Sequence, residues 1–238
     1  MVAKLKEIYR GKAKTMYETD NPKALYCEFR NDISAFNAEK LANLDRKGLI
    51  NNHFNAFIMQ HLENEGVETH FIEKVGETAS LVKKLKMFPL ECVVRNLSAG
   101  SLCKRLGIEK NQPLNPPVFE FFYKNDKLGD PLINESHIIT FKWATAEEIA
   151  QMKALTFRVN EILSKLFKVN DLLLADYKLE FGLFEGRIIL ADEFTPDGCR
   201  IWDAKTLEIF DKDRFRQDLG NVVESYELVA RRLQIPLK

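Results

Sequence analysis

The spacing of hydrophobic residues changes along the chain from alternation to helical periodicity. Residues 4–31 alternate charged and apolar side chains, with turn signals at Gly11 and at residues 20–22, which predicts short antiparallel strands. After Gly48, residues 49–62 carry apolar side chains at helical spacing. The first part of the chain is therefore predicted to form a sheet followed by a helix.

A second group of strands is expected beyond this helix. Residues 81–82 and 91–95 have strand-forming sequences, whereas residues 84–89 fit no regular element and are expected to connect two lobes. The predicted fold class is α+β. It has an antiparallel, β-rich N-terminal lobe over residues 1–86 and a larger α/β lobe over residues 87–238.

The second lobe is predicted to combine one aromatic strand with two helices. The proline-rich residues 113–117 predict a loop, and residues 118–123 predict a strand. Apolar residues then recur at helical spacing over residues 146–167 and again over residues 211–233, the latter despite Gly220. We expect both helices to pack on the sheet.

Length and charge narrow the class of protein. A chain of 238 residues fits one large α+β unit or two lobes that share a cleft. Lys+Arg and Asp+Glu are equal at 35 each, so no overall positive field favours nucleic acid or an anionic membrane. The charged N-terminal residues and the absence of a long apolar stretch predict a cytoplasmic protein. The four scattered cysteines favour buried thiols over a zinc cluster.

The strongest candidate for chemistry is a charged strand. An apolar run over residues 172–175 leads into Asp176-Tyr177-Lys178-Leu179-Glu180, and alternation places Asp176, Lys178 and Glu180 on one face. Two carboxylates beside a lysine suit Mg²⁺ bound to phosphates. The alternative is a solvated face with cross-strand ion pairs, but the apolar lead-in indicates an interior strand and favours a site.

The next strand, residues 187–193, ends in a second pair of carboxylates. A three-residue turn over residues 184–186 would pair Lys178 with Asp192 and place Asp192 on the face of Glu180. A two-residue turn would present Glu193 instead. We therefore expect the three-residue turn and Asp192 as the second metal ligand.

Three further segments could bind phosphate. Lys12 and Lys14 follow Gly11 on alternate positions, although lysines on an edge strand more often only protect that edge. Ser101 is predicted as the N-cap of a short helix, with Arg95 available for bidentate contact; a routine cap is the alternative. The turn over residues 195–199 could direct Arg200 into the same cleft.

Two long segments of the chain resemble the signature segments of the SAICAR synthase family. They are residues 87–101, MFPLECVVRNLSAGS, and residues 174–182, LADYKLEFG. Residues 9–14 and 192–200 are also similar to family segments and occur in the same order. The resemblance covers nearly the whole chain and is specific because each signature is long.

The resemblance implies a ligase of purine biosynthesis. Such an enzyme uses ATP to join carboxyaminoimidazole ribonucleotide (CAIR) to L-aspartate, releasing ADP and phosphate. It further implies an ATP-binding cleft between two lobes, Mg²⁺, small-molecule substrates only, and a possible homodimer. As a hypothesis, the CAIR carboxylate is activated as an acyl phosphate, because a free carboxylate is a poor acyl donor.

The resemblance also assigns residues. Lys12 and Lys14 would contact the ATP phosphates, and the backbone from Leu85 to Met87 would hold adenine. Glu180 and Asp192 would hold Mg²⁺, and Lys178 would steady the transferring phosphoryl group. Arg95, Ser101 and Arg200 would bind the ribonucleotide phosphate, and Asp176 and Asp130 would lie near the aminoimidazole.

One position departs from the pattern of the family. Many similar chains carry aspartate where this one has Asn37, so the binding site for L-aspartate stays open, with Lys124 as a candidate. Two other functions remain as alternatives: another kinase-like or ATP-grasp-like enzyme, and a nucleotide-sensing or RNA-binding module suggested by the aromatic strand.

Overall fold

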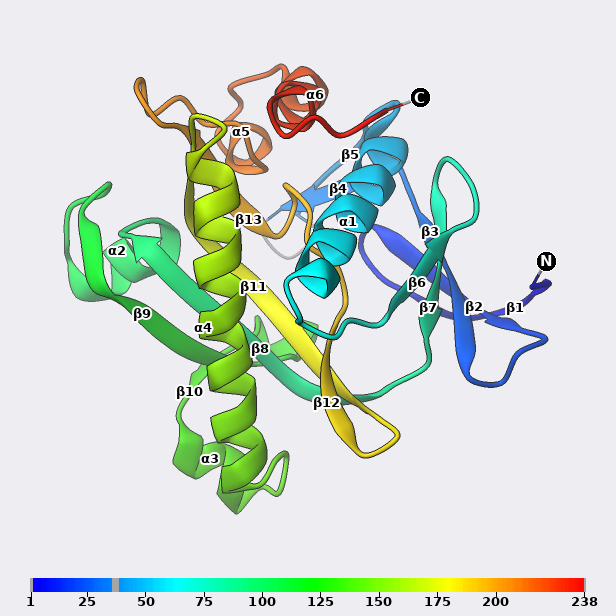
Figure 1. Ribbon diagram of the computed structural model, residues 1–238. Coiled ribbons are helices and arrows are strands. Elements are labelled where there is room, and N and C mark those ends of the chain that lie inside the picture. Colours follow the sequence, from blue (N-terminus) through cyan, green and yellow to red (C-terminus); the bar gives the residue numbers. More distant parts are fainter. Residues whose placement is uncertain (1, 36–38, 238) are drawn as a thin grey trace.

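The computed structural model describes residues 2–35 and 39–237 and confirms an α+β fold built on antiparallel sheets (Figure 1). Asn37 lies outside the described residues. The first sheet has five strands in the order β1-β2-β3-β7-β6. Their bounds are β1 Lys4–Arg10, β2 Lys14–Thr19, β3 Ala24–Phe29, β6 Phe71–Lys74 and β7 Ala79–Lys83.

The second sheet has β11 at its centre, and its main path runs β10-β9-β8-β11-β12, with β13 also paired to β11. Its strands are β8 Lys86–Leu97, β9 Pro113–Tyr123, β10 Leu132–Ile133, β11 Leu172–Phe184, β12 Arg187–Ala191 and β13 Cys199–Asp203. A two-stranded sheet joins β4 Asp32–Ala35 to β5 Lys40–Asn43. β11 is therefore paired along its two edges with three other strands, β8, β12 and β13.

Two long helices cover the sheets, as the helical spacing predicted. α1 Lys47–Asn64 packs on strands of the first sheet, and α4 Ala146–Lys168 packs on β11 and β8 (Figure 1). α4 begins with a capping box, in which Thr145 Oγ1 accepts from the Glu148 amide at 3.2 Å and Glu148 Oε2 accepts from the Thr145 amide at 2.8 Å. The shorter helices are α2 Gly100–Leu106, α3 Glu135–Thr140, α5 Asp213–Arg216 and α6 Val222–Arg232, with a 3₁₀ turn at Asp126–Leu128.

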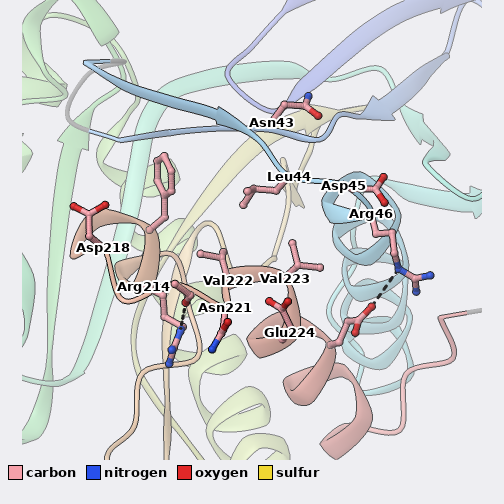
Figure 2. Close-up of a pocket in the computed structure, with 13 residues that line it drawn as sticks. Asn43, Leu44, Asp45, Arg46, Arg214, Asp218, Asn221, Val222, Val223 and Glu224 are labelled. Atoms are coloured by element: carbon pink, nitrogen blue, oxygen red, sulfur yellow. Dashed lines mark hydrogen bonds and ion pairs between the residues drawn. The ribbon is translucent and has the colours of Figure 1, made fainter.

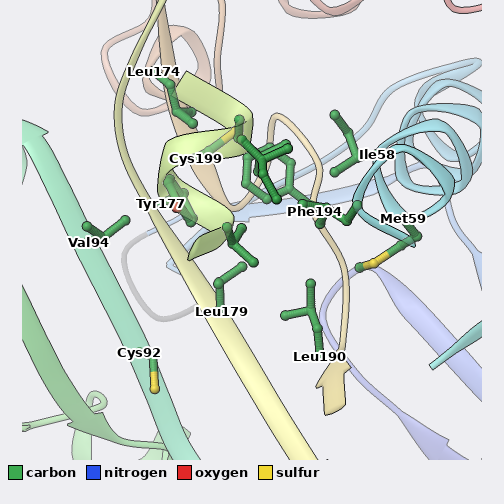
Figure 3. Close-up of a cluster of buried hydrophobic side chains, with 14 of the residues drawn as sticks. Ile58, Met59, Cys92, Val94, Leu174, Tyr177, Leu179, Leu190, Phe194 and Cys199 are labelled. Atoms are coloured by element: carbon green, nitrogen blue, oxygen red, sulfur yellow. The ribbon is translucent and has the colours of Figure 1, made fainter. Parts of the chain in front are cut away.

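One hydrophobic core connects the two sheets. Figure 3 shows Ile58 and Met59 of α1 beside Leu190 and Phe194, which lie close to Leu179 on β11. Phe194 packs edge-on against the Tyr177 ring at a centroid distance of 5.2 Å. Tyr177 and Leu179 therefore belong to the face of β11 that packs into the core, and Asp176, Lys178 and Glu180 belong to the opposite face.

Two segments that were predicted to be irregular belong to strands in the structure. Lys86 to Pro89 are not irregular, because β8 begins at Lys86; only residues 84–85 connect the two sheets. The proline-rich residues 113–117 are not a loop but the first half of β9, where Asn115-Pro116 is a cis peptide bond. Prolines are tolerated there because this end of β9 pairs with β8 only irregularly. The division into lobes at residue 86 stays a prediction.

The predicted helix over residues 211–233 is wrong as a single element. α5 ends at Arg216 and α6 begins at Val222, and between them Asp218, Gly220 and Asn221 have left-handed backbone angles (φ 56°, 67° and 50°). Left-handed residues cannot continue a right-handed helix. The apolar spacing persisted because both pieces pack on the same neighbours, so periodicity alone missed the break.

The remaining expectations concern cysteines and membrane spans. The four cysteines are all free and buried; they are Cys27, Cys92, Cys103 and Cys199. Across residues 2–35 and 39–237, no helix is both long and apolar enough to cross a membrane.

Candidate active site

Strand β11 brings the predicted charged residues into one sheet and gives each a different set of partners. Its register places Asp176 opposite Arg95 of β8 and opposite Arg200 of β13. Two residues further, Lys178 lies opposite Val93, and Glu180 lies opposite both Glu91 and Ala191. The charged face of β11 therefore divides into an arginine-rich end at Asp176 and a lysine-rich end at Glu180.

Lys178 is the centre of the lysine-rich end. Its Nζ lies 2.7 Å from Glu180 Oε1, 3.2 Å from Glu91 Oε1 and 3.2 Å from Asp192 Oδ2. Burial alone would lower the pKa of Lys178, but the charges of Glu180, Asp192 and Glu91 together raise it well above its usual value. Lys178 is therefore a fixed positive charge held among three carboxylates.

Two more lysines complete this group. Lys14, on β2 of the first sheet, forms an ion pair with Asp192, and its Nζ lies 3.0 Å from Glu193 Oε2. The Glu193 contact is close but lacks hydrogen-bond geometry, so the buried Oε2 has no hydrogen-bond donor among the described residues. Lys124, just past β9, pairs with Glu180. The contacts of Lys14 join the first sheet to the second.

We call these seven residues the lysine cluster: Lys14, Lys124, Lys178, Glu91, Glu180, Asp192 and Glu193. With every group ionised, four carboxylates face three ammonium groups, which leaves one net negative charge. Burial raises the pKa of Glu91, Lys178 opposes that shift and Glu180 adds to it. The cluster thus carries more carboxylate charge than its lysines neutralise.

The hairpin that carries Asp192 differs from the prediction. Phe184 pairs with Arg187 and Glu180 with Ala191, so the turn has two residues, Glu185 and Gly186, rather than three. The two-residue register was expected to present Glu193 in place of Asp192. Instead both approach Lys14, because β12 ends at Ala191 and Asp192 has a left-handed backbone angle (φ 59°) that breaks the alternation.

At the other end of β11, two arginines clamp one aspartate. Asp176 accepts hydrogen bonds from Arg95 Nη1 at 2.7 Å and from Arg200 Nη1 at 2.8 Å. Arg95 Nε also donates to Glu120 of β9 at 2.7 Å, and Arg200 Nε donates to Asp213 of α5 at 2.8 Å. Asp176, Arg95 and Glu120 are largely buried, so each charge needs these partners.

Arginines also stand at both ends of this series. Arg105 of α2 pairs with Glu120, and Arg216 of α5 pairs with Asp213. We call the series the arginine chain; in order it runs Arg105, Glu120, Arg95, Asp176, Arg200, Asp213 and Arg216. Four guanidinium groups face three carboxylates, which leaves one net positive charge.

Ser101 lies beside the arginine chain but not where it was predicted. The cap of α2 is Ala99, and Ser101 is the second residue of the helix, so its hydroxyl caps nothing. Ser101 Oγ instead accepts from Arg105 Nη1 at 3.1 Å and from Arg95 Nη2 at 3.3 Å. The preceding Gly100 has φ 54°, and a Cβ there would clash with the Arg200 guanidinium. Ser101, Arg95 and Arg200 therefore lie close together at the start of α2.

The other predicted site residues lie around these two groups. Lys12 lies outside β2 and pairs with Asp126 at 2.8 Å. Asp130 Oδ1 accepts from the Asn125 amide at 2.8 Å and so closes the loop after β9. A Cβ on Gly182 would lie 2.8 Å from Leu85 Cβ and 3.1 Å from Met87 Sδ, so the segment connecting the sheets runs close against β11.

A cavity of about 690 Å³ is lined by none of the members of the two charged groups (Figure 2). It is formed between the segment after β5 and the segment joining α5 to α6, and an ion pair of 3.2 Å between Arg46 and Glu227 lies along it. None of the residues predicted from the sequence to bind substrate or metal lines this cavity.

The sequence is similar to proteins of one family over almost its whole length. The SAICAR synthetase family profile matches residues 7–233. Phosphoribosylaminoimidazole-succinocarboxamide synthase from Idiomarina loihiensis is 62% identical over 234 residues, covering 98% of this chain and 99% of the relative. The protein of the same name from Cellvibrio japonicus is 59% identical over 230 residues, covering 97% and 98%.

The chain belongs to the SAICAR synthetase family.

Solved structures of SAICAR synthetases agree with this assignment. The crystal structure of phosphoribosylaminoimidazole-succinocarboxamide synthase from Ehrlichia chaffeensis has a TM-score of 0.95 at 43% identity, covering 97% of this chain and 99% of the other. A SAICAR synthetase solved in complex with ADP has a TM-score of 0.92 at 42% identity, covering 94% and 96%. Because the family match covers nearly the whole chain, this protein is a ligase of purine biosynthesis, and the RNA-binding alternative is set aside.

Several residues of the two charged groups were not predicted from the sequence. Glu91, Glu120 and Asp213 hold Lys178, Arg95 and Arg200 in place, yet each belongs to an element that pattern analysis treated as structural. Glu120 gave one signal, because it is the charged residue inside the aromatic strand. Asp213 gave none, because its contact depends on where α5 meets β13.

Proposed function

We propose that the charged face of β11 is the site where ATP drives the joining of CAIR and L-aspartate, giving SAICAR, ADP and phosphate. The observation that carries the proposal is the pair of oppositely charged groups on one strand. The lysine cluster has a surplus carboxylate, which suits a divalent cation, and the arginine chain has a surplus guanidinium, which suits a phosphate.

Mg²⁺ would be held by Glu180 and Asp192. The residues fit this ion because carboxylate oxygens are its preferred protein ligands and the lysine cluster leaves one negative charge unbalanced. In the described part of the chain, no three acidic, histidine or cysteine side chains already surround a common point; the carboxylates turn to lysines instead. When bound, the ion would neutralise charge on the transferring phosphoryl group.

The three lysines would stabilise phosphate charge. Lys178, at the centre of the cluster, contacts both proposed metal ligands and would contact the transferring group. Lys14 would reach it from the first sheet, and Lys12 would contact phosphates from the turn before β2. Lys124 is tied to Glu180, so we place it in the lysine cluster. The backbone from Leu85 to Met87 would hold adenine.

The ribonucleotide would lie along the arginine chain. Arg95 and Arg200 present planar, bidentate donors, and Ser101 adds a hydroxyl between Arg95 and Arg105. Asp176 would orient the ribonucleotide beside them, with Asp130 at its aminoimidazole. Since Asp176 and Lys178 are two residues apart on β11, the CAIR carboxylate would lie close to the phosphoryl group.

This arrangement supports an acyl phosphate intermediate. Phosphoryl transfer to the CAIR carboxylate makes it a good acyl donor, and the aspartate amine then displaces phosphate to form the amide. The residues contribute positioning and charge neutralisation rather than a covalent bond.

An ADP-release assay tests the proposal. Release with ATP, Mg²⁺, CAIR and L-aspartate is expected, and its absence would refute the function. Omitting L-aspartate asks whether ADP forms before the amine binds. Wild-type turnover by Glu180→Ala at limiting Mg²⁺ would refute the metal assignment. The homodimer stays a prediction, which light scattering can check.

A further inference from the structure

One lysine stands apart in the way its charge is balanced. Over residues 2–35 and 39–237, every other lysine or arginine that is at least partly buried has a carboxylate oxygen within 4.0 Å. Lys212 is partly buried and has none. The Nζ atom of Lys212 is not among the buried polar atoms that lack a hydrogen-bond partner, so this ammonium group stays open to an anion that enters from solvent.

Lys212 lies between the two charged groups. Its amide donates to Pro196 O at 3.2 Å, and in the same turn Gly198 O accepts from the Lys178 amide at 3.2 Å. The turn over residues 195–198 therefore has Lys178 on one side and Lys212 on the other. Lys212 is also the residue just before α5, which carries the last two members of the arginine chain.

The carboxylates nearest to Lys212 are paired with other residues. Burial lowers its pKa; Asp197 opposes that shift, Arg216 and Lys47 add to it, and Glu193 opposes it. Asp197 is already occupied, because it accepts from Lys47 Nζ, from Asn51 Nδ2 at 2.8 Å and from Tyr226 Oη at 2.8 Å. Glu193 is paired with Lys14. An incoming carboxylate would give Lys212 the partner it lacks.

The proposed substrates differ in which cation can receive them. The phosphates of ATP match the lysine cluster, and the ribonucleotide phosphate matches the arginine chain. The remaining substrate, L-aspartate, brings two carboxylates, and its amine must reach the activated CAIR carboxylate between those two groups. Lys212 is the partly buried cation that the first two substrates leave without a partner.

We propose that Lys212 binds a carboxylate of L-aspartate and so positions the amine for attack. The inference rests on the proposed function, and it adds a residue to the substrate-binding site for the acidic amine. It involves no covalent step. It also accounts for an unpaired charge that the fold does not need.

Steady-state kinetics of Lys212→Met test this inference. Methionine keeps the length and removes the charge, so we expect KM for L-aspartate to rise about 10- to 100-fold, the range for one charge-assisted hydrogen bond. KM for ATP and for CAIR should change less than about twofold. L-malate, which has the same carboxylates but no amine, should lose potency as a competitive inhibitor by a similar factor.

Two controls separate binding from folding. Lys205→Met removes an exposed charge that lies 3.6 Å from Asp171, and it should leave every parameter unchanged. The melting temperature of Lys212→Met should stay the same or rise, because an unbalanced charge is lost. Lys212→Arg should recover part of the affinity for L-aspartate.

The outcomes distinguish the inference from the function beneath it. If wild-type protein releases no ADP in the complete mixture, the proposed function is wrong. If wild-type is active but Lys212→Met raises KM for CAIR or ATP instead, or changes nothing, the inference is wrong. A lowered melting temperature with all constants altered would give Lys212 a structural role, which also overturns it.

Discussion

The two ends of the charged face of β11 differ in both the type and the balance of their cations. The lysine cluster has three ammonium groups against four carboxylates, whereas the arginine chain has four guanidinium groups against three. Lysine is a compact point charge, and arginine offers planar, paired donors. The first group therefore suits a moving phosphoryl group with its metal, and the second suits a fixed phosphate.

The two groups also differ in how they are assembled. The arginine chain joins β8, β9, β11, β13 and helices α2 and α5, all downstream of residue 86. The lysine cluster is completed from the first sheet by Lys14. A movement between the sheets would therefore disturb the lysine cluster while leaving the arginine chain intact. If the proposed assignment holds, nucleotide binding is the step that depends on how the sheets meet.

The largest effect should come from Lys178→Met. Loss of a fixed positive charge at the transferring group should lower kcat about 100- to 1000-fold, the range for removing one preorganised donor. KM for CAIR should change little, because the arginine chain is untouched. Rates of ADP release measure this, with the exposed Lys165→Met on α4 as control. A raised KM for CAIR with unchanged kcat would mean that the lysine cluster contributes to CAIR binding and not to phosphoryl transfer.

Arg200→Lys should have the next largest effect, on the other end of the strand. Lysine cannot hold Asp176 and Asp213 together as Arg200 does, so KM for CAIR should rise about 10- to 100-fold. The same exchange at the exposed Arg187 is the matched control. An unchanged KM for CAIR, measured by initial rates, would remove the arginine chain from ribonucleotide binding.

A smaller effect is expected from Gly100→Ala. The added Cβ would push the Arg200 guanidinium away from Asp176, so KM for CAIR should rise about tenfold, equivalent to about 1.4 kcal/mol. Gly107→Ala is the control, because Gly107 has a similar left-handed angle (φ 65°) and nothing within 4 Å of the new atom. Equal effects from the two substitutions would indicate backbone strain alone.

The smallest effect concerns the pH dependence of stability beside the arginine chain. Burial, with the charge of Asp213, raises the pKa of Asp211 from 3.8 to about 7. A carboxyl group with a raised pKa stabilises the folded protein below its unfolded pKa, and that contribution is lost as pH rises from about 4 to 7. Urea unfolding from pH 4 to 8 should show this slope, and Asp211→Asn should abolish it.

If Asp211→Asn keeps the same pH slope, Asp211 is not the source of that slope. The positive charge of the arginine chain would then keep Asp211 ionised. The difference in charge balance between the two groups would then be smaller than the ion pairs indicate.

Local pattern predicted the two long helices and the central strand. The capping box at Thr145 and the helical spacing of α4 are properties of neighbouring residues, and so is the alternation that places Lys178 and Glu180 together. The site was less predictable because its residues meet through tertiary contacts. Lys14 and Asp192 come from different sheets, and Asp192 reaches Lys14 through a left-handed backbone angle that alternation cannot supply.

Two further errors have the same physical origin. Ser101 was predicted as the cap because serine favours that position, but the cap is Ala99, two residues earlier, and the Ser101 hydroxyl accepts from arginines. The break before α6 depends on left-handed residues such as Asn221, which apolar spacing does not report. Lys212 was unremarkable in the sequence, since its lack of a partner appears only when all neighbours are placed.

The most direct test of the account measures two requirements in the same three proteins. ADP release by wild-type, Asp192→Asn and Arg200→Lys is followed while Mg²⁺ and CAIR are varied separately. The account predicts that Asp192→Asn raises only the Mg²⁺ requirement and that Arg200→Lys raises only the CAIR requirement. If both substitutions raise both requirements by the same factor, the lysine cluster and the arginine chain have no separate roles and the central claim is contradicted.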